Sequence, residues 1–167
     1  MRAGDFDRLY AEHAQGLFAF LAYRTGDRAL AEDLLADTFE RVLTARRGYD
    51  RRRGSRKTWL YAIALNLLRD HVRRAGAEAR ALERSLATVA AGGDGEHDAF
   101  ALVADRDELA PALSTLSDEE REAIALRFGA DLTVPEIAKL TGEKLTTVEG
   151  RVYRALRKLR DELRSEA

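Results

Sequence analysis

The chain has 167 residues, 46% of them hydrophobic and 34% charged, so it can bury one modest core or two small ones. It has no cysteine, and its three histidines share no ligand spacing, which excludes disulfide frameworks, thiolate metal sites and a catalytic constellation. We therefore expect no cofactor, no metal and no enzymatic activity. No stretch approaches the roughly 20 apolar residues that span a bilayer, and no apolar secretory segment opens the chain, which predicts a cytoplasmic protein without membrane insertion.

The net charge of -1 conceals an uneven distribution. Residues 1–75 hold 15 basic and 10 acidic side chains, residues 76–111 hold 3 and 8, and residues 112–167 hold 10 and 11. The strongest basic excess lies at 46–74, with ten Arg or Lys against two Asp. This excess suits a polyanion, because each neutralised phosphate releases counterions. A solvated surface would have the same composition, and charge alone does not decide between the two.

Helical periodicity organises the first 45 residues. Only two prolines and frequent Ala, Leu, Arg and Glu favour an all-α protein. Apolar side chains recur at spacings of three and four over residues 5–24, which predicts one amphipathic helix. Gly26 ends it, and Asp27 is available as the N-cap of a second helix. We expect the buried stripe of the second helix to contain Leu30, Leu34, Leu35, Thr38, Phe39 and Val42.

A basic loop and a two-faced helix follow. RRGYDRRRGSRK (46–57) has two glycines and no apolar period, so we expect a loop, and 59–74 is predicted as the third helix. One flank of this helix can dock on the first two helices through Leu60, Ile63, Ala64, Leu67 and Leu68. The other flank carries Trp59, Asn66, Asp70 and Arg73.

The second flank has side chains of the kinds that can hold a single DNA strand. Trp59 can stack on an unpaired base, Asn66 can offer a donor and an acceptor to a base edge, and arginines bind phosphate. Together with the mobile cations of the loop, these side chains could receive a base extruded from the duplex. Trp59 as a core anchor and Asn66 as a surface residue are the alternative readings.

The composition changes after residue 75. Residues 76–111 begin with helix-forming residues and reach a Gly and Asp cluster at 92–95, which predicts a flexible acidic linker. A short helix at 98–109, ending before Pro111, is expected within it. The fold class is therefore all-α, with two small helical domains, 1–75 and 112–167, on either side of this linker.

The C-terminal segment contains a predicted helix-turn-helix. Capping-box patterns pair Ser117 with Glu120, Thr133 with Glu136 and Thr146 with Glu149. Gly142 lies where a tight turn between the last two helices needs a positive φ angle. The last helix has a core stripe of Val148, Val152, Ala155, Leu156, Leu159 and Leu163. Opposite it lies a polar stripe of Thr147, Arg151, Arg154 and Lys158, which suits the major groove, although many helical hairpins share this spacing.

Three stretches resemble the extracytoplasmic-function (ECF) sigma factors, a compact class of the sigma-70 family of bacterial RNA polymerase. They are ALAEDLLADTFERVL (29–43), SRKTWLYAIALNLLRDHVRR (55–74) and the segment 116–163, in this order. The resemblance implies a sigma region 2 domain, a linker that threads the polymerase cleft, and a sigma region 4 domain. It also implies core RNA polymerase and promoter DNA as partners, and an anti-sigma factor as a regulator.

The resemblance assigns roles to particular residues. Exposed positions of 29–43 would dock on the clamp helices of the largest polymerase subunit, although helix-surface solubility would explain them too: Asp33, Asp37, Thr38 and Glu40. The minus-ten element would be melted and held by Arg51, Arg52, Arg53, Arg56, Lys57, Trp59, Asn66, Asp70, Arg73 and Arg74. The helix-turn-helix would sit on the β flap and read the minus-thirty-five duplex with Lys144, Thr146, Thr147, Glu149, Arg151, Tyr153, Arg154 and Lys158.

Four positions depart from the family pattern. Glu149 stands where Lys or Arg is common, Gly150 replaces a common Ser, and Pro135 replaces an acidic residue in a first helical turn. Asp70 stands where an amide is expected, so the base preference does not follow. Two other classes stay open: a helix-turn-helix regulator that acts without core polymerase, and a helical protein-interaction adaptor.

Overall fold

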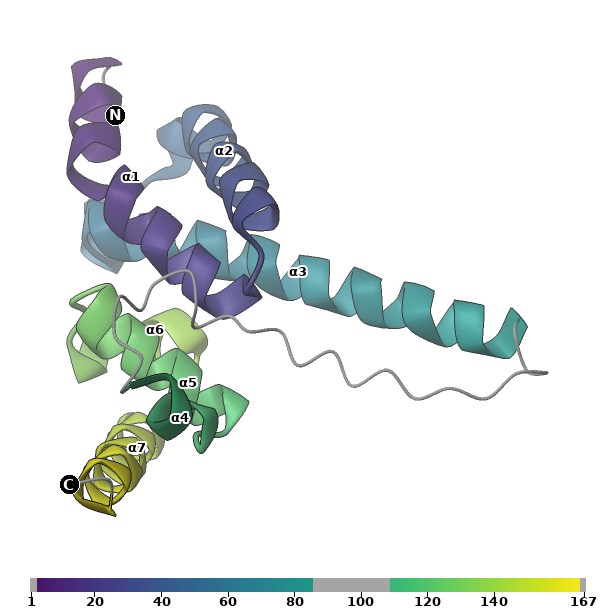
Figure 1. Ribbon diagram of the computed structural model, residues 1–167. Coiled ribbons are helices and arrows are strands. Elements are labelled where there is room, and N and C mark those ends of the chain that lie inside the picture. The colour runs from purple at the N-terminus through teal and green to yellow at the C-terminus, as the bar shows by residue number, and fades with distance from the viewer. Residues whose placement is uncertain (1–2, 86–108, 166–167) are drawn as a thin grey trace.

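The computed structural model describes residues 3–85 and 109–165, and every regular element in these two ranges is helical (Figure 1). The all-α prediction is thereby confirmed. The elements of the first range are α1 (Ala3–Thr25), α2 (Arg28–Ala45), the short 3₁₀ turns η1 (Arg46–Gly48) and η2 (Arg51–Arg53), and α3 (Arg56–Ser85). Those of the second are α4 (Leu109–Ser114), α5 (Asp118–Ile124), the π turn η3 (Ala125–Gly129), α6 (Val134–Thr141) and α7 (Leu145–Ser165).

The first three helices form a bundle, and the turn between α1 and α2 has the predicted glycine and N-cap. Gly26 adopts φ 65°, and the Asp27 carboxylate accepts a hydrogen bond of 3.1 Å from the Leu30 amide, so the N-cap is confirmed. The core contains Leu17, Leu21, Leu34, Phe39, Val42, Leu60, Ala64 and Leu68. Phe39 and Tyr61 tie the helices together through edge contacts with Phe6 and Phe20, at ring-centroid distances of 5.9 and 5.6 Å.

The third helix is much longer than predicted. It begins at Arg56, where the Ser55 hydroxyl accepts from the Thr58 amide at 3.1 Å, and it continues to Ser85. Its last part projects beyond the bundle (Figure 1), and residues 77–85 are all exposed. The predicted end of this helix at 74 is therefore wrong. AEARALERS consists mostly of strong helix formers, which extend an existing helix without tertiary support.

In the C-terminal half, two of the three predicted capping boxes are confirmed. Ser117 and Thr133 each cap a helix reciprocally with the glutamate three residues later. The third is wrong, because α7 begins at Leu145 and Thr146 already lies inside it. Pro111 lies within α4, so the expected helix end before it is also wrong, since proline fits a first helical turn. The remainder of that expected helix, 98–108, lies outside the described residues.

The two halves pack directly against each other. Figure 1 shows α5 and α6 beneath α1 and α3. Leu126, Leu132 and Ile137 are buried in one hydrophobic cluster with the core of the first three helices. The two helical units expected from the sequence therefore share an apolar interface.

Glu120 is the buried charge that joins α5 to α7. Only 6% of the residue is exposed, and its carboxylate accepts from the Ser117 amide at 3.0 Å and from Lys158 Nζ at 2.7 Å. The Lys158 hydrogen bond is the largest cause that holds the pKa of Glu120 below its usual 4.5. Because the folded state has the lower pKa, the stabilisation is present above the unfolded pKa and is lost as the pH falls through the folded value.

We expect Glu120→Gln to lower the free energy of unfolding by about 1.5–3 kcal/mol near neutral pH, as for the loss of a hydrogen bond to a charged group. The difference from the wild type should shrink as the pH falls below 4.5. Denaturant unfolding across this pH range measures both. Asp161→Asn, an exposed change on α7, should leave the curve unchanged. An equal loss at every pH would contradict the ionic role of Glu120.

Candidate nucleic-acid interface

The flank of α3 that carries Trp59 and Asn66 is open at the surface; we call it the Trp59–Asn66 face. Asn66 is exposed, and Trp59 is partly buried, with one side against the core. The Trp59 ring contacts the Tyr49 ring at a centroid distance of 5.2 Å. A cavity of about 400 Å³ opens on this face, lined by Tyr49, Arg53, Trp59, Asn66, Lys139 and Leu140, among others. Neither predicted reading residue is sealed inside the bundle.

The basic loop is shaped by local hydrogen bonds. The Asp50 carboxylate accepts from the Arg52 amide at 2.9 Å and starts η2, while the Tyr49 hydroxyl donates to the Gly54 carbonyl at 3.1 Å. These bonds leave Arg51, Arg52 and Arg53 exposed side by side. Of these three, Arg53 lines the cavity, and Arg52 also forms an ion pair of 3.5 Å with Asp50.

Two other cations of the predicted set are held by partners. Arg56 forms an ion pair of 3.3 Å with Asp5 of α1. Lys57 Nζ donates to the Asp131 carbonyl oxygen at 3.1 Å, from the N-terminal half to the C-terminal half. These two cations are therefore not free in this arrangement.

The arginines after Asn66 are also paired. Arg73 contacts the Asp70 carboxylate at 2.6 Å, and Arg74 Nε donates to the Asp70 carbonyl at 3.3 Å. Asp70 thus arranges both arginines along the helix surface. Arg69, which is absent from the predicted set, lies one turn after Asn66 and contacts Glu122 of α5 at 3.0 Å.

The helix-turn-helix has the predicted turn. Gly142 caps α6 with φ 72°, and α7 begins three residues later. The α7 helix packs on α5 and α6 through Val148, Val152 and Ala155, which are buried. Leu156 and Leu163 were expected in the same core stripe, but they are 37% and 41% exposed, so this part of the predicted stripe is wrong.

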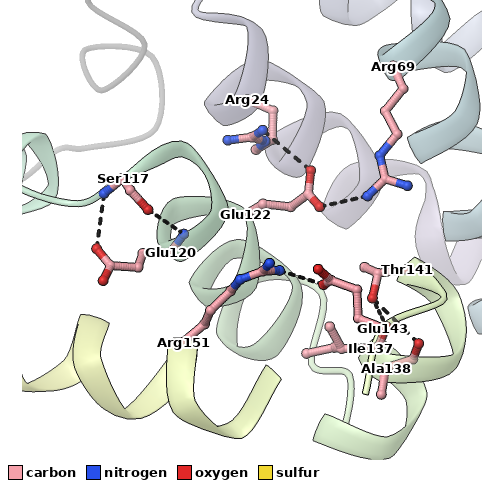
Figure 2. Close-up of polar contacts among 10 residues, drawn as sticks. All are labelled: Arg24, Arg69, Ser117, Glu120, Glu122, Ile137, Ala138, Thr141, Glu143 and Arg151. Carbon is pink, nitrogen blue, oxygen red and sulfur yellow. Dashed lines mark hydrogen bonds and ion pairs between the residues drawn. The ribbon is translucent and has the colours of Figure 1, made fainter. Parts of the chain in front are cut away.

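The predicted basic stripe of α7 is not a free surface opposite the core. Arg151 donates to Glu143 of the turn at 2.5 Å, and its side chain is only 22% exposed (Figure 2). This bond is the largest cause that lowers the pKa of Glu143 and raises the pKa of Arg151. Lys158 forms an ion pair with Glu120 at 2.7 Å, and Arg154 lies 3.9 Å from the same carboxylate. Arg151 and Lys158 therefore connect α7 to neighbouring elements, a pairing that helical spacing alone does not reveal.

The exposed side of α7 instead carries a different set, which we call the α7 outward face: Thr146, Thr147, Tyr153, Arg154 and Arg157. Lys144 and Glu149 are exposed beside it. Arg157 is absent from the predicted set, although its spacings of three and four from Arg154 and Tyr153 place it on one face with them. Helical spacing alone would therefore have been enough to include Arg157 in the predicted set.

The acidic surface of α2 agrees with the prediction at three of four positions. Asp33, Asp37 and Glu40 are exposed. Thr38 is fully buried, and its hydroxyl donates to the Leu34 carbonyl at 2.6 Å, so its expected exposure is wrong. Thr38 had been assigned both to the buried stripe and to the exposed docking surface of this helix. With 3.6 residues per turn, one position points to only one side of the helix, and here it is the buried side.

Within residues 3–85 and 109–165, no helix combines the length and apolarity needed to cross a membrane. The same ranges hold no group of three or more His, Asp or Glu side chains arranged for a metal ion.

Comparison with known proteins identifies both halves. Residues 9–78 match the Sigma-70 region 2 family, and residues 106–159 match the Sigma-70 region 4 family. The chain is 28% identical to the ECF RNA polymerase sigma factor BldN of Streptomyces coelicolor, covering 94% of this chain and 60% of BldN. It is 31% identical to the ECF RNA polymerase sigma factor SigX of Bacillus subtilis, covering 96% of this chain and 86% of SigX. This chain thus spans about three fifths of the length of BldN.

A solved structure agrees over nearly the whole chain. The sigma factor RpoE of Bartonella quintana, in complex with the anti-sigma factor NepR, matches with a TM-score of 0.74 and 25% identity, covering 98% of this chain and 99% of that one. Sigma factors are transcription initiation factors rather than enzymes. The region 2 and region 4 matches, in this order and with an ECF relative covered over 86% of its length, show that the chain belongs to the ECF group of the sigma-70 family.

Proposed function

We propose that this chain binds core RNA polymerase in the cytoplasm, directs it to promoters with minus-thirty-five and minus-ten elements, and promotes DNA melting without breaking a covalent bond. The observation that carries the proposal is the Trp59–Asn66 face, open beside three exposed arginines on a chain that also has a helix-turn-helix. Family membership supports it independently.

Melting is driven by binding energy. Extruding a base costs a few kcal/mol of stacking and pairing. Stacking on an aromatic ring returns about 1–3 kcal/mol per base, and phosphate contacts add to it. We assign stacking to Trp59, contact with a base edge to Asn66, and the backbone of the separated strand to the arginines of the loop, to Lys57 and to the Arg73 and Arg74 pair. Asp70 acts by aligning these last two.

Duplex reading is assigned to the α7 outward face. Thr147 and Arg154 can reach base edges or phosphates, and Thr146, Lys144 and Arg157 extend the contact along the backbone. Glu149 can accept from a cytosine amino group. Arg151 and Lys158 act through the turn and through α5, by fixing the angle at which α7 enters the groove.

Docking on polymerase is assigned to the acidic surface of α2. Asp37 and Glu40 line a cavity of about 290 Å³ with Arg41, Thr44 and Leu67, and Asp33 is exposed on the same helix. This surface suits a basic helix of the largest subunit, the clamp helices, while the region 4 half would sit on the β flap. An anti-sigma factor is a further proposed partner, because the related RpoE was solved with one.

The direct test is run-off transcription with purified core polymerase. We expect the chain to produce specific initiation on promoters selected from its own genome. If the chain yields no initiation on any selected promoter, while core polymerase is active with another sigma factor, the proposed function is wrong.

Substitutions in the two proposed DNA-contacting surfaces should affect different steps of initiation. We expect Asn66→Ala to reduce open-complex formation roughly fivefold to thirtyfold, as for a loss of 1–2 kcal/mol, with little change in duplex binding. Arg154→Ala should do the reverse. Permanganate footprinting and duplex binding by holoenzyme measure the two steps, and Glu83→Ala on the exposed end of α3 is a matched control. Equal losses in both assays for each variant would reject this division.

Two arginines of α7 are assigned different roles: Arg157 contacts the DNA, and Arg151 stabilises the fold through Glu143. Arg157→Ala should leave the unfolding midpoint unchanged and reduce the salt dependence of duplex binding by about one released counterion. Arg151→Ala should lower the unfolding midpoint, because Glu143 loses its partner. Thermal unfolding and duplex titration at several salt concentrations measure both effects. A destabilised Arg157→Ala with an unchanged salt slope would contradict the assignment.

A further inference from the structure

A cavity with an apolar lining lies between α1 and the first elements of the C-terminal half. Its volume is about 190 Å³, and its walls include Phe20 and Tyr23 of α1, Ile124 of α5 and Phe128 of η3. Every described residue in its lining is uncharged, whereas the cavities at α2 and at the Trp59–Asn66 face have charged side chains in their walls. The three cavities share no described lining residue. This cavity therefore differs in place and in chemistry from the surfaces assigned to polymerase and DNA.

The arginines whose charges act on Tyr23 are engaged outside the lining. Arg24 Nη2 lies 3.4 Å from the Glu122 carboxylate (Figure 2), and Arg121 Nη2 donates to the Leu116 carbonyl at 3.1 Å. Burial raises the pKa of Tyr23 to about 12, so its hydroxyl stays protonated and neutral near pH 7. A molecule in this cavity thus meets no formal charge in the described lining.

Phe128 gives the cavity access to solvent. This residue lines the cavity, yet 54% of it is exposed. It belongs to the π turn η3, a rare geometry that is frequent at functional sites. The Arg127 guanidinium lies 5.2 Å from the centroid of the Phe128 ring, a cation–π contact that favours one orientation of the exposed ring. An aromatic side chain therefore borders the mouth of the cavity, and a small molecule can enter beside it.

From its size, its lining and its access we propose that this cavity is a binding site for a neutral molecule with one aromatic ring and a short apolar substituent. A cavity of about 150 Å³ lined by Leu, Ile and Phe takes up benzene, so the larger volume here holds one ring and a small group beyond it. The inference does not rest on the proposed function, because no residue assigned to DNA or polymerase lines the cavity.

Two physical terms favour this class of ligand over water. Phe20, Tyr23 and Phe128 offer ring faces and edges to a bound aromatic ring. Water in an apolar cavity finds few hydrogen-bond partners, so displacing poorly ordered water by an apolar group gains affinity. A carboxylate on the same ring would lose its hydration without meeting a cation in the described lining, and it should be rejected.

The test is a fluorine NMR titration of the full chain with para-fluorotoluene as the probe. We expect saturable binding with a dissociation constant on the order of 1 mM. Bound probe should also raise the midpoint of thermal unfolding, since it binds the folded chain alone. The charged analogue para-fluorobenzoate should show no binding that depends on the cavity. No saturable binding of para-fluorotoluene by the wild type overturns the inference, and an apolar side chain of a partner protein would then be the better occupant.

A cavity-filling change locates the bound probe. Ala19 of α1 lines the cavity, and Ala19→Leu adds three carbon atoms to its wall while keeping a strong helix former. We expect this variant to bind para-fluorotoluene roughly tenfold more weakly than the wild type. Ala36→Leu is the matched control, because it makes the same change at an exposed position of α2 and should bind like the wild type. Equal affinities of Ala19→Leu and Ala36→Leu overturn the inference.

A second variant keeps the test valid should Ala19→Leu disturb the packing of α1. Phe128→Ala removes an exposed ring from the mouth of the cavity, so the unfolding midpoint without probe should change little. Its affinity for para-fluorotoluene should fall roughly threefold to tenfold, because the ring loses an aromatic neighbour. An affinity equal to that of the wild type overturns the inference. Run-off transcription decides the proposed function separately, so the two failures are distinguishable.

Discussion

The architecture depends on α3, which buries one flank in the bundle and exposes the other to solvent. Leu60, Ala64 and Leu68 are almost fully buried in the N-terminal bundle, and burial of large aliphatic side chains stabilises by about 1.5–3 kcal/mol each. This fixes the rotation of the helix about its axis. Once the rotation is fixed, the 3.6-residue period places Asn66 outward. The outward position of Asn66 is therefore a consequence of packing.

The local parts of the fold could be predicted because their chemistry lies within a few residues. The Asp27 cap, the capping boxes of Ser117 and Thr133 and the left-handed Gly142 each depend on side chains or backbone within four positions. The false capping box at Thr146 shows the limit of such patterns. Any Thr followed three residues later by Glu has the same signature, and here the turn had already placed Leu145 in the helix.

The pairing of charges could not be predicted, because it depends on tertiary contacts. Helical spacing places Arg151, Arg154 and Lys158 along one side of α7 but does not say which acidic residue approaches from another element. Glu120 of α5 and Glu143 of the turn do so in the structure. The mistaken exposure of Thr38 has a related cause. A small hydroxyl can satisfy itself on the Leu34 carbonyl and be buried, so polarity alone did not predict its side of the helix.

An arginine-rich surface has to be stable in the absence of a bound anion. Unpaired cations repel one another, and intramolecular acidic partners reduce that repulsion. Asp70 does this within α3 for Arg73, and Glu122 does it between the halves for Arg24 and Arg69. The two kinds of partner differ in consequence. An acid on the same helix stays beside its arginine whatever the arrangement of the two halves, whereas an acid from another element pairs with it only while the two elements are in contact. An anion that approached Arg69 would therefore compete with Glu122 of α5, whereas one that approached Arg73 would meet Asp70 on the same helix.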